Sequence, residues 1–367
     1  MQIVRPNYND CLTNLSNSIL KYFGCETINP TLPDIDEILK ENNSKNVLVI
    51  LFDGMGSNIL ERNLSENSFL RKHVLRNLHS VFPPTTTAAT TSLLSGLHPS
   101  QHGWLGWDLY FKKENKIVTM FRNTIKDTDN KIKGDIPLAH KYYGYTPISK
   151  KILEKYEAYE ILPFGPNPYI NLNDMSNQII NLCKKTGKKL IYAYCEEPDS
   201  SSHLYGADSR DVKSIYKTIN SKVESLVEKL EDTTVIIIAD HGHITSESIT
   251  LSNYPDVFNT LKKDISIEGR ACNFFIKTGM KDLFEDLFAK YFENDFILYS
   301  KKQVLEKHVF GIGKEHKYFK DSLGDFLAIA VSNKYFRYNE NSVSYKSMHS
   351  GMTDEEMLIP LIVIKKD

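Results

Sequence analysis

Three short apolar runs of this chain each lead into an aspartate. They are residues 47–52 with Asp53, residues 190–194 with Asp199, and residues 235–239 with Asp240. Short runs rich in β-branched and aromatic residues are typical of strands that are buried on both faces of a parallel sheet. The carboxyl ends of parallel strands share one edge, so we expect the three carboxylates to meet in the crevice where open α/β sheets bind ligands. Because carboxylates repel one another and are costly to bury, this cluster indicates a cation site.

The bulk composition limits the classes of partner. The chain has 367 residues, of which 41% are hydrophobic and 25% are charged, which is enough for a sizeable core. A formal net charge of -1 argues against a nucleic-acid polymer as partner. No signal-peptide pattern opens the chain and no apolar run approaches the roughly 20 residues that cross a bilayer, so no membrane association is expected. No oligomeric state is predicted.

The five cysteines indicate a compartment. They are scattered and odd in number, and none belongs to a CxxC pair. Reduced thiols are the usual state of such cysteines inside the cell. We therefore expect a cytoplasmic protein.

Strand and helix patterns alternate along most of the chain, which predicts an α/β fold with a central, mostly parallel sheet and helices on both faces. An aromatic and charged segment interrupts this alternation, and a later segment has the pattern of a small α+β subdomain. After it, residues 326–331 and 358–364 are expected to return to the core sheet. The predicted division is a core of residues 1–254 and 321–367, an aromatic insertion over the site at about 104–145, and an inserted subdomain of residues 255–320.

Histidines stand at ligand spacing from two of the aspartates. Asp240 and His241 are adjacent, and they can share a ligand only if the strand has ended before them. Asp199 and His203 are four residues apart, which places both on one face of a helical turn. His349 lies in a turn-like segment before the last predicted strand.

The resulting set of candidate ligands mixes carboxylates and imidazoles. Such sets suit zinc, with manganese or iron as alternatives, and disfavour calcium. Six residues are too many for one tetrahedral ion, so we predict two divalent metal ions about 4 Å apart, an arrangement that supports in-line phosphoryl transfer. The candidates are Asp53, Asp199, His203, Asp240, His241 and His349.

Three consecutive threonines open a predicted helix at residues 85–94. Hydroxyls in this position are usually helix caps. Alternatively, one of them attacks phosphorus, helped by the helix terminus, which attracts anions, and by a metal that lowers the pKa of the hydroxyl. The spacing alone does not decide which of Thr85, Thr86 and Thr87 would be the nucleophile.

Five segments of the chain resemble the type I phosphodiesterase/nucleotide pyrophosphatase branch of the alkaline phosphatase superfamily. They extend from about residue 45 to the C-terminal region in the order expected for that family, and the resemblance implies an alkaline phosphatase-like fold. The segments are residues 47–56, 82–103, 194–206, 236–243 and 348–363.

The resemblance also implies a role for each candidate residue. Its pattern makes Thr86 the nucleophile and a ligand, with Thr87 as the alternative. One metal would be held by Asp53, Thr86, Asp240 and His241, and the other by Asp199, His203 and His349.

The implied function is a two-metal phosphoesterase that hydrolyses phosphodiester or nucleotide pyrophosphate bonds in a small phosphate ester or nucleotide. Eukaryotic-type members have Phe-Pro-Asn after the nucleophile, whereas this chain has Thr-Ala-Ala at residues 87–89. The backbone N–H of Thr87 is therefore a candidate donor to the phosphate, and Trp107 is a candidate for stacking on the substrate. Alternatives are a phosphonate hydrolase, a phosphomonoesterase, or a non-catalytic binding protein on the same fold.

Overall fold

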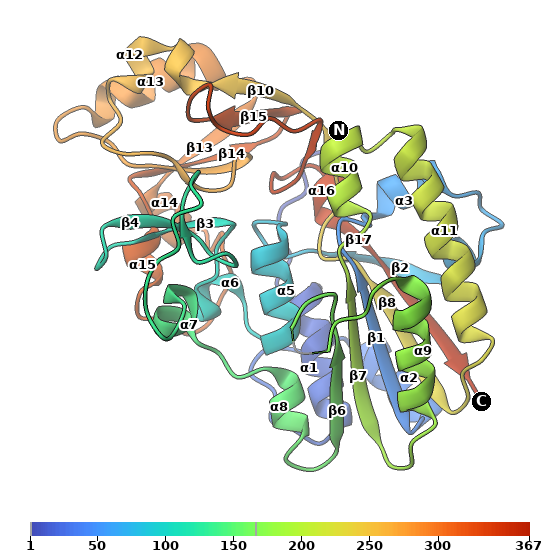
Figure 1. Ribbon diagram of the computed structural model, residues 1–367. Coiled ribbons are helices and arrows are strands. Elements are labelled where there is room, and N and C mark those ends of the chain that lie inside the picture. Colours follow the sequence, from blue (N-terminus) through green and yellow to red (C-terminus); the bar gives the residue numbers. More distant parts are fainter. Residues whose placement is uncertain (1, 166) are drawn as a thin grey trace.

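The computed structural model describes residues 2–165 and 167–367. Its centre is a six-stranded sheet with strand order β2-β17-β8-β1-β7-β6 (Figure 1). Strands β6, β7, β1 and β8 are parallel, as predicted, and β17 runs antiparallel to both β8 and β2. The strands are β1 (Asn46–Phe52), β2 (Val74–His79), β6 (Glu157–Ile161), β7 (Lys189–Cys195), β8 (Thr233–Ile238) and β17 (Leu358–Lys366).

Helices cover both faces of this sheet, and each buries one apolar stripe against it. In α11, for example, Val212, Tyr216, Ile219, Val223 and Leu226 are buried at helical spacing. One face carries α1 (Leu12–Tyr22), α5 (Thr86–Ser95) and α8 (Ile148–Ile152), with α2 (Pro33–Asn42) against α1. The other carries α3 (Ser57–Asn63), α9 (Leu172–Cys183) and α11 (Arg210–Val227), with α4 (Phe69–Lys72) against α11.

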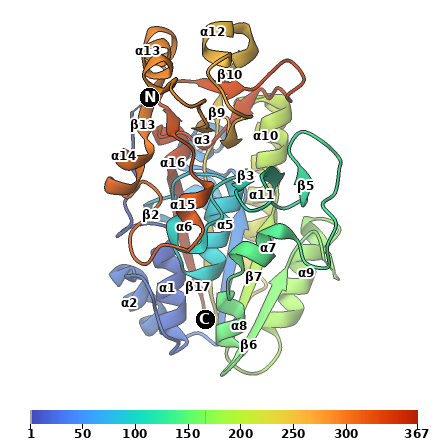
Figure 2. The same ribbon diagram turned by 90° about the vertical axis from the view of Figure 1, so that its left-hand side faces the viewer.

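A second sheet has seven strands in the order β13-β14-β12-β11-β3-β4-β5 and lies beyond the carboxyl ends of the central strands (Figures 1 and 2). The aromatic insertion and the late α+β segment are thus parts of one sheet, joined where β3 pairs with β11. Its strands are β3 (Asp108–Phe111), β4 (Lys116–Thr119), β5 (Thr124–Ile125), β11 (Ser266–Ile267), β12 (Ala271–Phe274), β13 (Phe296–Ser300) and β14 (Phe326–Ala330).

One strand prediction is wrong. Residues 326–331 were expected in the core sheet, but β14 pairs antiparallel with β12 and β13 in the second sheet. All five residues of β14 are buried. A short, fully apolar run identifies a buried strand without identifying its partner. The division into a core and an inserted domain stays a prediction.

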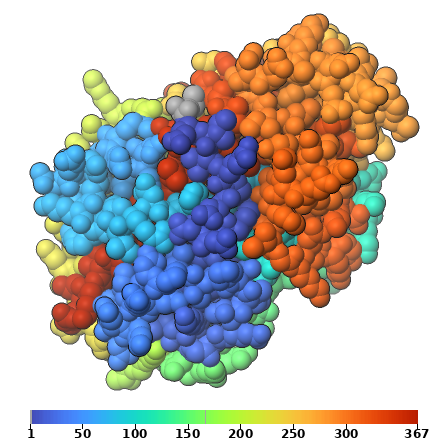
Figure 3. Space-filling view, turned by 180° about the vertical axis from the view of Figure 1, so that it is seen from behind, coloured from blue at the N-terminus to red at the C-terminus, as the bar shows by residue number. Residues whose placement is uncertain are grey.

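Short elements complete the chain. They are α6 (Pro99–His102), α7 (Leu138–Tyr143), α10 (Asp199–Tyr205), β9 (Ile244–Thr245), β10 (Glu247–Thr250), a 3₁₀ turn (Leu251–Asn253), α12 (Pro255–Phe258), α13 (Lys281–Phe292), α14 (Lys301–Glu306), α15 (Phe319–Ser322), β15 (Lys334–Arg337), β16 (Ser347–Met348) and α16 (Asp354–Met357). Within the described ranges, no helix is long and apolar enough to cross a membrane. The dark blue N-terminal segment lies against the orange part of the chain in Figure 3, and Tyr8 donates a hydrogen bond to the Val309 carbonyl at 2.7 Å.

A buried ion pair joins the second sheet to the central one. Arg270, just before β12, donates to both oxygens of Glu356 in α16 at 2.6 and 2.7 Å, and both side chains are fully buried. Glu356 also accepts hydrogen bonds from the Gly351 amide and the Thr353 hydroxyl, both at 2.6 Å. The pair therefore also orders the loop that follows His349.

Replacing Glu356 by alanine should lower the free energy of unfolding by about 3–5 kcal/mol, because it leaves the buried Arg270 charge without a counter-charge. Urea denaturation measures this change. The matched control is Glu340→Ala, which removes a carboxylate that is 66% exposed. A loss below about 1 kcal/mol in Glu356→Ala would contradict the structural role of the pair.

Candidate active site

The three strand-end aspartates do meet at one edge of the central sheet. Asp53 follows β1 directly, and its amide donates to the Cys195 carbonyl at 2.9 Å. The Asp199 amide in turn donates to the Asp53 carbonyl at 3.0 Å. A side chain on Gly54 would clash, because its Cβ would lie 2.8 Å from the His243 ring and 3.0 Å from Asp199. The glycine after Asp53 thus permits the close approach of the two strand ends.

Asp199 is the centre of the first donor group. Its Oδ1 lies 3.4 Å from His203 Nε2, 2.5 Å from His243 Nε2 and 3.8 Å from His349 Nε2. One ligand atom from each of the four residues lies within 4.8 Å of the others, a separation that suits a single cation. The helical spacing expected for Asp199 and His203 is confirmed, since both belong to α10.

The second donor group contains Asp53, His241 and, again, Asp199. His241 Nε2 lies 3.2 Å from Asp53 Oδ1 and 4.0 Å from Asp199 Oδ1. Asp240 is beside this group, with its Oδ2 3.6 Å from His241 Nε2. That oxygen is buried and has no hydrogen-bond partner within the described residues, whereas Asp240 Oδ1 accepts from the Gly54 and His241 amides. A buried, unpartnered carboxylate oxygen fits a metal ligand.

The hydrogen bonds of three histidines also fit metal binding. The Nδ1 atoms of His203, His241 and His349 face backbone carbonyls at 2.8, 3.0 and 3.2 Å. A carbonyl only accepts, so the neutral rings of His203 and His241 carry their proton on Nδ1 and turn the Nε2 lone pair toward the carboxylates. His349 Nδ1 also lies 2.9 Å from the Ser350 hydroxyl, which can donate or accept. Lone pairs and carboxylate oxygens repel unless a cation lies between them. Such outer hydrogen bonds are the usual support of metal-ligating histidines.

The pKa values of several side chains in and beside the two donor groups are strongly shifted. Burial and the neighbouring Asp53 carboxylate raise the pKa of Asp240 well above its usual range. Burial also opposes ionisation of Asp199, but His203 and His243 outweigh it and hold the Asp199 pKa well below its ordinary value. Burial lowers the pKa of His241, yet Asp240 and Asp53 raise it to about 10. The site therefore attracts positive charge in spite of its burial.

The three threonines at the start of α5 are in different surroundings. Thr85 donates to Glu268 Oε1 at 2.6 Å, and Thr87 is fully buried with no hydrogen-bond partner for its hydroxyl within the described residues. Thr86 is partly exposed, and its Oγ1 lies 3.3 Å from both Asp53 Oδ1 and His241 Nε2. Of the three hydroxyls, that of Thr86 is the one directed at the donor groups.

Sequence reasoning missed two side chains at the site. His243 belongs to the first donor group, and its Nδ1 lies 3.1 Å from the Ser347 hydroxyl. The Ser347 hydroxyl donates to the Ile244 carbonyl at 2.9 Å and can accept from His243 Nδ1, so the ring turns Nε2 toward Asp199 Oδ1, 2.5 Å away. Its position two residues after His241 is the sequence feature that could have identified it as a site residue. The Tyr194 hydroxyl donates to Asp53 Oδ2 at 2.5 Å, and no pattern in the sequence distinguished it from a core aromatic.

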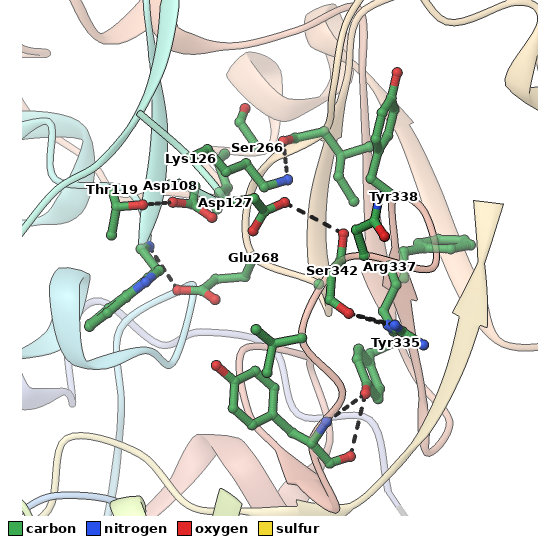
Figure 4. A pocket seen from close by; sticks show the side chains of 18 of the residues that line it. Asp108, Thr119, Lys126, Asp127, Ser266, Glu268, Tyr335, Arg337, Tyr338 and Ser342 are labelled. Atoms are coloured by element: carbon green, nitrogen blue, oxygen red, sulfur yellow. Dashed lines mark hydrogen bonds between the residues drawn. The ribbon is translucent and has the colours of Figure 1, made fainter. Parts of the chain in front are cut away.

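A polar pocket of about 360 Å³ opens beside the donor groups, between the second sheet and the segment 335–348 (Figure 4). Tyr345 lines it and places its ring 4.7 Å from the ring of His203. Trp107 is also in its wall, and its amide donates to Glu268 at 2.8 Å. Thr87, the other candidate for substrate binding, does not line this pocket; as the second residue of α5 it has an amide without an acceptor inside the helix.

The fold and site define an alkaline phosphatase-like α/β protein with two overlapping Asp/His donor groups beside a threonine. Residues 47–352 match the family model described as type I phosphodiesterase / nucleotide pyrophosphatase. The chain belongs to that family, as its motifs indicated.

Curated relatives match part of the chain. Human ectonucleotide pyrophosphatase/phosphodiesterase family member 1 is 26% identical over 185 residues, which cover 46% of this chain and 20% of the relative. The bis(5'-adenosyl)-triphosphatase ENPP4 of Pongo abelii is 25% identical over 219 residues, which cover 53% of this chain and 47% of the relative. The chain thus spans half or less of the length of these relatives.

Solved structures share the fold over most of the chain. An inactive variant of murine ectonucleotide pyrophosphatase / phosphodiesterase 5 in complex with AMP superposes with a TM-score of 0.67 at 19% identity, covering 86% of this chain and 87% of that one. Phosphonoacetate hydrolase from Sinorhizobium meliloti 1021 in complex with phosphonoformate gives a TM-score of 0.62 at 14% identity, covering 86% and 89%. These likenesses establish the alkaline phosphatase-like fold.

Proposed function

We propose that the protein is a two-metal phosphodiesterase or nucleotide pyrophosphatase with Thr86 as its nucleophile. The observation that carries this proposal is the position of Thr86 Oγ1, 3.3 Å from one member of each ligand type, Asp53 and His241. Family membership and the AMP bound to the murine structural neighbour support a small nucleotide or phosphate ester as substrate.

The donor groups fit two divalent cations. Asp53, Asp240, His241 and Thr86 would hold one, and Asp199, His203 and His349 the other. Mixed carboxylate and imidazole sets favour zinc, with manganese as the alternative. When bound, the ions lower the pKa of the threonine hydroxyl and offset the charge on the attacking and leaving oxygens.

The side chains then have separate tasks. Thr86 Oγ1 attacks phosphorus in line, with Asp53 Oδ1 at 3.3 Å as an acceptor for its proton, and the bond to the departing alcohol or phosphate breaks. The free amides at the start of α5, including that of Thr87, hold a phosphoryl oxygen. Water then hydrolyses the phosphothreonine ester and restores the hydroxyl. Tyr194 keeps Asp53 in place by donating a hydrogen bond to its carboxylate.

A substrate panel with metal depletion tests this function. Chelation should abolish hydrolysis of bis-p-nitrophenyl phosphate, and added zinc or manganese should restore it. Diesters and nucleoside pyrophosphates should exceed p-nitrophenyl phosphate in kcat/KM by at least tenfold. Phosphonoacetate is included because phosphonoacetate hydrolase has the same fold. A chelated protein that keeps full activity, or a preference for the monoester or the phosphonate, would overturn the proposal.

We also propose a cytoplasmic location. All five cysteines are free, and four of them are buried. Free thiols are the usual state in a reducing compartment. Expression of a tagged copy followed by fractionation tests this location, and recovery outside the cytoplasm would overturn it.

A further inference from the structure

Glu268 lies between the pocket and the candidate nucleophile, and the proposed reaction does not use it. Its Oε1 accepts hydrogen bonds from the Thr85 hydroxyl at 2.6 Å and from the Trp107 amide at 2.8 Å. Thr85 directly precedes Thr86, so Glu268 contacts the segment that carries the candidate nucleophile. The carboxyl group is directed into the pocket (Figure 4).

The other oxygen of this carboxyl is available to a ligand. Within the described ranges, Glu268 Oε2 has no hydrogen-bond partner, although Oε1 has two. Glu268 is only partly buried and lines the open pocket, so this oxygen can accept a hydrogen bond from a ligand hydroxyl that replaces solvent there. Burial raises the pKa of Glu268 to about 7, against the hydrogen bonds from Thr85 and Trp107 that lower it.

Two of the three cationic side chains of the pocket wall are hydrogen-bonded to other parts of the protein. Lys126 Nζ donates to Asp264 Oδ1 and to the Ile265 carbonyl, both at 2.9 Å. Arg337 donates to the carbonyls of Glu340 and Ser342, each at 3.0 Å. The wall has three cationic side chains and four carboxyls, so its charge nearly balances. The Arg122 side chain has no ion pair or hydrogen bond within the described ranges, and its guanidinium lies 5.8 Å from the Trp107 ring, so it can donate to a ligand oxygen. The near balance of charge offers an ammonium group little net attraction.

Aromatic rings form another part of the wall. Trp107, Tyr335 and Tyr345 line the pocket together with the carboxyl of Asp108, which accepts from the Thr119 hydroxyl at 2.6 Å. Flat apolar faces combined with a few hydrogen-bond acceptors suit a small ligand that has both C–H surface and hydroxyl groups.

We propose that this pocket binds a neutral, polyhydroxylated alcohol portion of the phosphoester substrate, and that Glu268 is the specificity-determining residue that accepts a hydrogen bond from one of its hydroxyls. The inference rests on the proposed phosphodiesterase function and defines the substrate class of that same site. A pocket that hydrogen-bonds a substrate hydroxyl discriminates strongly against an analogue without that hydroxyl, because the polar group of the pocket then has no partner.

The test compares two diesters of equal chain length, methyl glyceryl phosphate and methyl propyl phosphate, with metal-loaded protein. The wild type should prefer the glyceryl diester by at least tenfold in kcat/KM. Glu268→Gln keeps an oxygen for Thr85 and Trp107 but replaces the pocket-facing oxygen by an N–H donor, so the preference should shrink at least fivefold. Glu247→Gln, which changes an exposed carboxyl of β10, should keep the wild-type preference.

The other outcomes would overturn either the proposed specificity or the proposed function. Equal kcat/KM for the two diesters in the wild type, or an equal loss on both in Glu268→Gln, would overturn the inference, the latter by reducing Glu268 to a positioning residue. A stronger preference for methyl 3-aminopropyl phosphate would overturn it in favour of a cation site. Bis-p-nitrophenyl phosphate has no hydroxyl groups, so failure to hydrolyse it would overturn the proposed function itself and would be distinguishable from a failure of the specificity.

Discussion

Thr86→Ala is expected to lower kcat for phosphodiester hydrolysis by at least about 1,000-fold, because it removes the attacking oxygen and leaves only binding and charge stabilisation. The substitution removes a hydroxyl at the edge of the donor groups but no carboxylate or imidazole. Metal content should therefore stay close to that of the wild type. Steady-state kinetics together with metal analysis of the same sample measure both effects.

A neighbouring threonine provides the control for this substitution. Thr90 lies one turn further along α5, and its hydroxyl donates to the Thr86 carbonyl at 2.6 Å. Thr90→Ala should retain kcat within about threefold, because the group lost is directed at the helix backbone. The assignment fails if Thr86→Ala hydrolyses substrate at the wild-type rate, and an accompanying loss in Thr87→Ala would move the nucleophile to that residue.

Asp199→Asn is expected to have an effect of similar size for a different reason. Asp199 Oδ1 lies within 4.0 Å of the Nε2 atoms of four histidines, and the residue belongs to both donor groups. An amide of the same shape lacks the negative charge that holds a cation there. Retained metal should fall from two ions to about one per chain after dialysis, and kcat should fall by about 1,000-fold.

Elemental analysis after dialysis and a titration that follows recovery of activity measure this loss. Asp208→Asn is the matched control, because its carboxylate is 56% exposed and pairs with Arg62 away from the site. It should bind metal as the wild type does. Two tightly held ions per chain in Asp199→Asn would contradict the shared role of this carboxylate.

Features that depend on local pattern could be predicted from the sequence. Strand-end placement of Asp53, Asp199 and Asp240 follows from apolar runs whose length and composition fix them as buried parallel strands. The i,i+4 spacing of Asp199 and His203 was readable in the same way, because a helical turn is a local structure.

Features that depend on which distant segments meet could not be predicted. His243 has the same residue type and local setting as His241, and only the fold decides that it faces Asp199 rather than solvent. The partner of β14 is likewise set by packing, since any buried sheet accepts such a run. Glu268 lies in a segment without a motif, and its proximity to Thr85 depends on how β11 meets the insertion.

The buried pair of Arg270 and Glu356 limits how the molecule can move. If the second sheet swung away from the central one to admit substrate, this pair would break, at a cost of about 3 kcal/mol or more. An open form of that kind would be populated in below about 1% of molecules. The pocket is then preformed, and substrate enters through its rim rather than through a hinge. We accordingly expect binding in a single kinetic step, with little change in the radius of gyration.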